Sequence, residues 1–207
     1  MSQLIACKSD DHIVLAADSK AVDVDDYGNL VELRIDRLHQ LSEYSAILTG
    51  GTAAGEAMCH SLKHFVIQEN LTHIDEIYRA GLPLLASEYE RFMRKTCEVH
   101  PIDPIHQVTF ILAGYTSKNP QNPFQMYLLW TKRKLPMLGS DEIGTAFSVP
   151  RSFRIEHHLH QLVSQKAGLD RMMTEVRRSM ETAVQSNKDA AEPLSYAWID
   201  DSGFRRL

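Results

Sequence analysis

SQLIACKSDDHIVLAADSK, residues 2–20, is the stretch that decides the fold of this chain. It holds two short apolar runs, residues 3–8 and 12–17, and only Ser9, Asp10 and Asp11 lie between them. Two such runs joined by a short polar turn predict a β-hairpin. The second run is almost entirely apolar, which is typical of a strand that is covered on both faces. The chain is therefore expected to begin with a buried hairpin.

Downstream of the hairpin, strand-like and helix-like segments alternate. Residues 21–29 are acidic and end in a turn signal, so we expect a loop there. From Thr52 the apolar spacing becomes helical, and Pro83 is expected to kink or break the second helix. The expected strands lie near 31–41, 44–49, 107–115, 124–131, 135–139 and 194–200, and the expected helices lie near 52–68, 72–95, 151–166 and 169–186.

The order of these elements indicates the architecture. Strands are followed by two helices, then by strands, two more helices and a last strand. Two consecutive helices cannot each cover a parallel crossover, so two antiparallel sheets stacked face to face, each with a helix pair on its outer side, are the simpler solution. The prediction is an α+β fold, a four-layer αββα sandwich that uses residues 1–207 as one domain.

Composition excludes several classes of function. The net charge is −5 over 207 residues, which argues against nucleic-acid binding because that needs a basic patch. No apolar run is long enough for a membrane span or a signal peptide. The three cysteines are widely separated and form no CxxC pair, a pattern that fits reduced thiols in the cytoplasm.

Two motifs carry a family resemblance. The hydroxyl residue, apolar strand and hairpin of residues 2–20 end in Ala-Ala-Asp-Ser-Lys, and Thr49-Gly50-Gly51-Thr52-Ala53-Ala54 leads into the first helix. Together they resemble the start of a mature proteasome β subunit, a family of N-terminal nucleophile hydrolases, here of the bacterial type. The resemblance implies the αββα sandwich, threonine-type endopeptidase chemistry and a peptide or unfolded-protein substrate.

The resemblance also implies the catalytic residues. Ser2 stands in place of the family's N-terminal threonine nucleophile. Asp18 matches the aspartate beside it, and Gly50 matches the glycine whose amide forms the oxyanion hole. The family's lysine falls on Arg37 after a short insertion in the acidic loop, or on Arg34 without that insertion.

Later matches are looser. Ser140 matches a serine that hydrogen-bonds the free amine, and Asp189 matches the aspartate that supports it. Glu192 stands where the family has a second serine. The residues expected to contact substrate are Lys20, Ala21, Leu48 and Thr52.

The chemistry depends on removal of Met1. A free α-amine has a pKa of about 7.7–8.0 and can act as general base on the hydroxyl of its own residue. An acylated nitrogen cannot do so, and Ser2 is small enough for an aminopeptidase to remove the methionine before it. Arginine in place of lysine supplies charge but effectively never gives up its proton.

The sequence leaves three functions open. The first is a proteasome-like peptidase in a homo-oligomeric ring or stacked rings, with an ATPase unfoldase as a further partner. The second is a catalytically inactive structural subunit of the same fold, and the third is a small-molecule amidase. No cofactor and no metal are expected, because His157, His158 and His160 do not share one helix face and have no acidic partner at ligand spacing.

Overall fold

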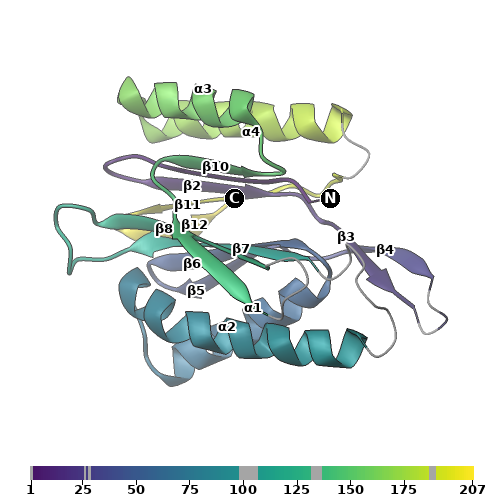
Figure 1. Ribbon diagram of the computed structural model, residues 1–207. Helices are drawn as coiled ribbons and strands as arrows, with labels where there is room; N and C mark the ends of the chain where they lie inside the picture. The colour runs from purple at the N-terminus through teal and green to yellow at the C-terminus, as the bar shows by residue number, and fades with distance from the viewer. Residues whose placement is uncertain (1, 26, 28, 98–106, 132–136, 187–189) are drawn as a thin grey trace.

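The chain folds into four layers, helices, sheet, sheet and helices (Figure 1). This computed structural model describes residues 2–25, 27, 29–97, 107–131, 137–186 and 190–207. Two five-stranded antiparallel sheets stack on each other, with one helix pair outside each sheet. The predicted αββα sandwich is therefore confirmed.

The first sheet is built around the N-terminal hairpin. Its strand order is β10-β1-β2-β11-β12, and every neighbouring pair is antiparallel. The short edge strands β10 and β12 were not expected from the sequence. The strands are β1 (Leu4–Lys8), β2 (Ile13–Ala17), β10 (Ala146–Val149), β11 (Ser195–Asp200) and β12 (Gly203–Arg206).

The second sheet follows the chain order, β5-β6-β7-β8-β9. Its central strands are long and largely buried, as the apolar runs of the sequence predict. The strands are β5 (Leu38–Ser42), β6 (Ser45–Gly51), β7 (Val108–Tyr115), β8 (Phe124–Thr131) and β9 (Leu138–Glu142).

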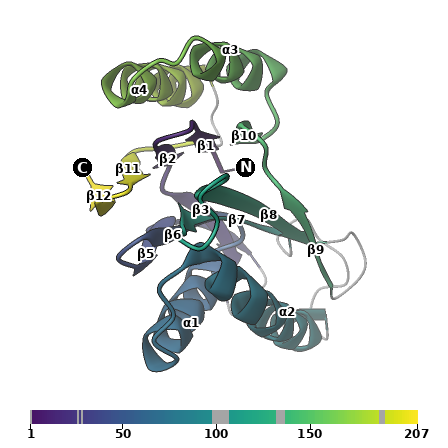
Figure 2. The ribbon, with the colours of Figure 1, turned by 90° about the vertical axis from the view of Figure 1, so that its left-hand side faces the viewer.

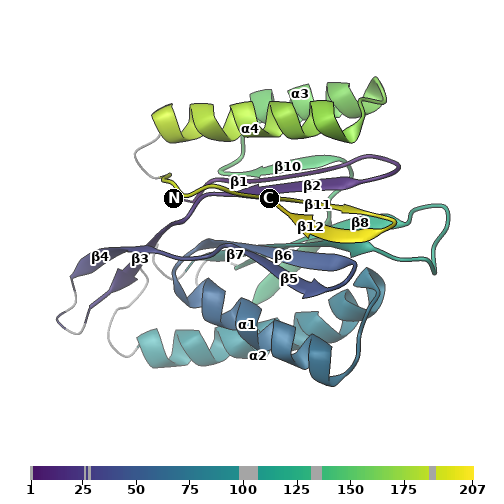
Figure 3. The same ribbon diagram turned by 180° about the vertical axis from the view of Figure 1, so that it is seen from behind.

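A third, two-stranded sheet projects from the body (Figure 3). It consists of β3 (Lys20–Val24) and β4 (Leu30–Arg34), with Lys20 paired to Arg34 and Val24 to Leu30. The expectation of a loop over 21–29 was therefore wrong for β3. Aspartate is uncommon in strands, which is why the acidic segment was expected to be a loop. A two-stranded ribbon that projects from the body can accept Asp23 because an antiparallel pair may have a face in contact with water.

The helices cover the outer faces of the sheets (Figures 1 and 2). α1 (Ala54–Gln68) and α2 (Ile74–Cys97) lie against the second sheet, and α3 (Phe153–Ser164) and α4 (Leu169–Ser186) lie against the first. Pro83 lies inside α2 and does not end it, because Ile77 and Leu85 on either side of it are both buried in the core.

Strand β1 contributes to two cores through its alternating side chains. Leu4 and Ala6 belong to the core between the two sheets, whereas Ile5 and Cys7 belong to the core beneath α3 and α4. Because side chains alternate along a strand, the side chains of the residues just before β1 are also expected to point alternately toward the two cores.

Among the helices that the structure describes, none combines the length and the apolar composition needed to cross a bilayer.

Candidate active site

Ser2 lies at the start of the first sheet and contacts the end of β6 in the second sheet. The backbone N–H of Gly51 donates a hydrogen bond to Ser2 Oγ at 2.9 Å. The alternation along β1 places the Ser2 side chain on the same side as Leu4, toward the second sheet. With 3% of its surface exposed, the hydroxyl is held in a site largely closed to water.

The two glycines at the end of β6 have different roles. Gly51 has a φ of +95°, and a Cβ there would lie 1.9 Å from the carbonyl oxygen of Gln107, so only glycine fits. A Cβ at Gly50 would instead lie 3.0 Å from Leu4 Cδ1 and 3.7 Å from Ser2 Cβ. The amide that faces the hydroxyl is thus that of Gly51, one residue beyond the expected Gly50. A sequence with two adjacent glycines does not reveal which of their two amides faces Ser2.

Asp18 fastens the backbone beside Ser2. Its carboxylate accepts three backbone hydrogen bonds, from Gln3 at 2.9 Å and from Lys20 and Ala191 at 3.2 Å each. The bond from Lys20, two residues on, is the turn that aspartate forms readily at the end of a strand. Burial raises the pKa of Asp18, while these N–H groups and the Arg37 guanidinium act in the opposite direction.

Arg37 is the buried cation of the site, with 1% of its surface exposed. Its Nε lies 3.6 Å from Asp18 Oδ1. Its terminal nitrogens donate to the carbonyl oxygens of Thr49 at 3.0 Å, of Gly51 at 3.1 Å and of Lys20. Burial lowers the pKa of Arg37, and the Asp18 carboxylate opposes that shift. Of the two arginines considered from the sequence, Arg37 is the one beside Asp18, whereas Arg34 is exposed on β4.

Ser140 does not join this group. It lies on β9, three strands from β6, which at about 4.8 Å per strand is roughly 14 Å across the sheet. Its Oγ accepts a hydrogen bond from Tyr78 Oη of α2 at 3.1 Å, so the hydroxyl faces the outer helices. Ser140 is therefore too far from Ser2 to bind its amine as the matched serine of the family would. The sequence similarity after residue 100 is too loose to fix which residue of this strand faces Ser2. Asp189 lies outside the described residues.

Three of the expected substrate residues lie near the site, and one does not. Ala21 follows Lys20 on β3, and Thr52 forms a parallel bridge with Val22 of the same strand. Lys20 Nζ pairs with Glu32 Oε1 at 2.6 Å across the hairpin. Leu48, in contrast, is packed fully between the two sheets, so it cannot line a pocket that substrate enters.

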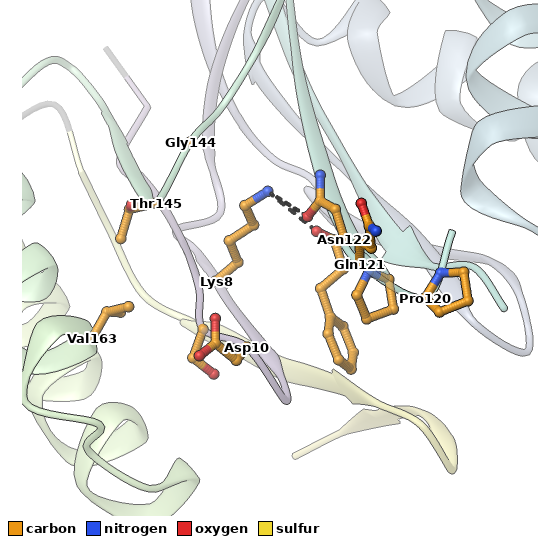
Figure 4. A pocket seen from close by; sticks show the side chains of 11 residues that line it. Lys8, Asp10, Pro120, Gln121, Asn122, Gly144, Thr145 and Val163 are labelled. Carbon is orange, nitrogen blue, oxygen red and sulfur yellow. Dashed lines mark hydrogen bonds between the residues drawn. The ribbon is translucent and has the colours of Figure 1, made fainter. Parts of the chain in front are cut away.

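A separate cavity of about 410 Å³ lies at the other end of β1 (Figure 4). Lys8 points into this region and donates to Asn122 Oδ1 at 3.4 Å and to the Phe124 carbonyl at 3.2 Å. Burial lowers the pKa of the Lys8 ammonium, and Glu142 opposes the shift. Six residues of extended strand, about 20 Å, separate Lys8 from Ser2, so this cavity is not part of the Ser2 site.

Among the described residues, no three His, Cys, Asp or Glu side chains gather as ligands for an ion. His158 instead pairs with Glu175 at 3.1 Å, and His157 contacts Gln161 at 3.1 Å. His158 thus connects α3 to α4, and the contact of His157 lies within α3.

Comparisons with known proteins identify the fold. No protein-family model matches the sequence, and a comparison with curated proteins finds no match. Among solved structures, the chain is similar to Anbu (ancestral beta-subunit) from Yersinia bercovieri, with a TM-score of 0.70 and 16% sequence identity over 99% of this chain and 86% of that chain. At such an identity the likeness shows the fold alone, and this chain has the proteasome-like αββα fold.

Proposed function

We propose that this chain is a proteasome-like peptidase with Ser2 as its N-terminal nucleophile. The observation that carries the proposal is the hydrogen bond from the Gly51 amide to Ser2 Oγ, in a buried site where Asp18 and Arg37 fix the surrounding backbone. Acyl transfer needs a preorganised N–H donor beside the nucleophile, because the carbonyl oxygen of the substrate acquires negative charge when the hydroxyl attacks it. The Gly51 N–H, which contacts Ser2 Oγ, is close enough to serve as that donor.

The proposed reaction begins once Met1 has been removed. The freed α-amine of Ser2 takes the hydroxyl proton, directly or through a water, and Oγ attacks the peptide carbonyl. The Gly51 amide stabilises the resulting oxyanion, a contribution of about 2.7–4 kcal/mol for one donor in a well-studied serine protease. The amine then returns the proton to the leaving nitrogen, and water hydrolyses the acyl-enzyme.

Arg37 has an electrostatic and positioning role in this scheme. Its guanidinium stays protonated near neutral pH and donates to backbone carbonyls of Lys20, Thr49 and Gly51, so it has no proton to relay. Its positive charge favours the neutral amine over the ammonium, which keeps the base available. In this scheme the α-amine is therefore the group of the chain that accepts the hydroxyl proton and returns it.

The remaining features of the proposal concern assembly and location. The structural neighbour is an ancestral beta-subunit. We infer that this chain forms a homo-oligomeric ring that encloses peptide or unfolded-protein substrates, with an ATPase unfoldase as a further partner. Lys20, Ala21 and Thr52 would contact the substrate. Cys7 and Cys59 are free and buried, which supports a reducing compartment such as the cytoplasm.

One observation favours the catalytically inactive alternative. Arg37, which the resemblance puts in place of the family's lysine, donates to three backbone carbonyls, an arrangement that also suits a purely structural cation. The small-molecule amidase has no comparable support in the described residues and stays a weaker alternative.

The test is the intact mass of the protein expressed in the cytoplasm, before and after incubation with a peptide epoxyketone. This reagent needs both the free amine and its hydroxyl. We expect loss of one methionine and a single adduct. Ser2→Ala is the matched control, because alanine still allows methionine removal but offers no hydroxyl. Retained Met1 without an adduct would favour the inactive subunit, and methionine loss without an adduct would point to Arg37 as the obstacle.

A further inference from the structure

A long groove runs between α3 and α4 on the outer face of the first sheet. Its volume is about 970 Å³, and its α4 wall extends from Glu175 to Ser186. These twelve helical residues span eleven rises of about 1.5 Å, about 16 Å in all, which matches about five residues of an extended peptide. Figure 2 shows the two helices side by side above the sheet that contains β1. The shape of the groove therefore suits an extended chain better than a compact molecule.

The floor of the groove contains an unsatisfied polar group. Gln3 lines the groove, 4% of its surface is exposed, and its Nε2 has no hydrogen-bond partner among the described residues. The side chain of Gln3 is on the Ile5 side of β1, toward α3 and α4. A buried donor without a partner destabilises the protein, so a ligand oxygen that accepted from it would recover much of that cost.

The walls of the groove are positively charged, in a chain whose net charge is −5. Arg154 and Arg178 line it, and neither forms an ion pair within the part of the chain that the structure describes. Glu175 is the acidic residue among the described lining residues, and its Oε2 lies 3.1 Å from His158 Nε2, within hydrogen-bond distance. Two arginines on opposite walls thus remain for an anionic ligand.

We propose that the groove between α3 and α4 binds an extended acidic peptide, whose carboxylates pair with Arg154 and Arg178 and one of whose oxygens accepts a hydrogen bond from Gln3 Nε2. This site is distinct from that of Ser2, because the two neighbouring side chains point to opposite faces of the sheet. Its occupancy does not depend on any reaction at Ser2, so binding can be measured whether or not the chain is a peptidase.

The test is the fluorescence anisotropy of a dye-labelled peptide of alternating glutamate and glycine, titrated with the full chain at low ionic strength. The control peptide carries glutamine in place of glutamate. We expect Arg178→Glu to weaken binding about tenfold, since one attraction becomes a repulsion. Arg171→Glu, on the same helix but outside the groove, makes the same change in net charge and should alter binding less than twofold.

Gln3→Leu separates the proposed role of the amide from effects on folding. Leucine removes the unpaired buried donor, so the melting temperature should rise while peptide binding weakens about fivefold. Equal binding of both peptides, or equal effects of Arg178→Glu and Arg171→Glu, would overturn the proposal. So would self-association that Arg178→Glu abolishes, because a second copy of the chain would then occupy the groove.

Discussion

Asp36 and Arg37 are adjacent in the chain, yet they belong to two aspartate–arginine pairs of opposite character. Arg206 grips Asp36 with both terminal nitrogens, at 2.7 and 2.8 Å, and both side chains are about two-fifths exposed. Arg37 lies 3.6 Å from Asp18, and both side chains are fully buried. The better geometry is at the surface, where water screens it, and the looser pair is buried, where neither charge can be hydrated.

The two aspartates also differ in the direction of their pKa shifts. Burial raises the pKa of Asp18 above its ordinary value despite the opposing hydrogen bonds and Arg37. Burial acts the same way on Asp36, but the hydrogen bonds from Arg206 and Leu38 outweigh it and hold the pKa of that carboxyl below its ordinary value. The Asp36–Arg206 pair is thus a well-formed ion pair at the surface. The Asp18–Arg37 pair is buried, so the loss of either partner would leave a charge without compensation.

The largest effect is expected from Arg37→Met. It leaves the Asp18 carboxylate without its counter-charge and three carbonyl oxygens without their donor. The free energy of unfolding should fall by about 3–5 kcal/mol, measured by urea denaturation. Arg34→Met is the matched control, since Arg34 is exposed, and it should change stability by less than about 0.5 kcal/mol. A small loss with Arg37→Met would mean that the buried pair behaves like the surface one.

Gly51→Ala is the next strongest perturbation of the buried region. The backbone at Gly51 has a φ of +95° and leaves no space for a Cβ beside the Gln107 carbonyl, so we expect a loss of about 2–4 kcal/mol and a displaced amide. At Gly50 the nearest atom is the flexible end of Leu4, so Gly50→Ala should be milder. If both variants alkylate equally fast with the epoxyketone, the Gly51 amide is not the donor that Ser2 uses.

The pH dependence of stability should have opposite signs for the two pairs. Because the folded-state pKa of Asp18 is raised, its contribution to stability falls as the pH rises from the ordinary value of about 3.9 through the folded value. The contribution of Asp36 is present above that ordinary value and is lost as the pH falls through its lowered folded value.

Urea unfolding of the wild type, Asp18→Asn and Asp36→Asn between neutral pH and about pH 3 measures both trends, because this range brackets the ordinary aspartate pKa. On acidification the wild type should gain stability relative to Asp18→Asn and lose it relative to Asp36→Asn. Trends of the same sign would show that the two carboxylates have similar environments in solution.

The smallest effect is expected at the surface pair. Arg206→Ala should lower the free energy of unfolding by no more than about 1 kcal/mol, and added salt should shrink the difference. Arg206 also donates to the Leu38 carbonyl at 3.1 Å and to Ser195 Oγ at 2.8 Å, so Arg206→Lys is the variant that keeps the charge but loses the fork. A loss that salt does not reduce would assign the stabilisation to these neutral partners.

The layers of the fold could be predicted because hydrophobic periodicity is strong in its long elements. The helix over 169–186 and the strand over 124–131 were predicted with their observed bounds. The hairpin of β3 and β4 was missed because its strands are partly exposed and rich in acidic residues, so they lack the apolar signal of a core strand. The edge strands β10 and β12 are only four residues long each.

The positions of site residues could be predicted from the sequence only where residues close together in the chain fix them. Ser2 lies just before β1 and Asp18 just after β2, and the pairing of Leu4 with Ala17 brings the two ends of this hairpin together. The choice between Arg34 and Arg37 depends on the length of the acidic hairpin, which the pattern did not reveal. The position of Ser140 depends on strand register across three ladders, which one sequence does not specify.

The position of Arg37 has a consequence for the order in which the protein folds. Its partners belong to all three sheets: Asp18 follows β2, Lys20 begins β3, and Thr49 and Gly51 lie on β6. Thr49 and Gly51 share the β5–β6 hairpin with Arg37, whereas the contacts with Asp18 and Lys20 join separate hairpins. We therefore expect the contacts with Asp18 and Lys20 to form late in folding, after these hairpins have docked. Contacts that form after the transition state slow unfolding but do not affect folding. The loss of Arg37 should therefore accelerate unfolding and leave the rate of folding almost unchanged.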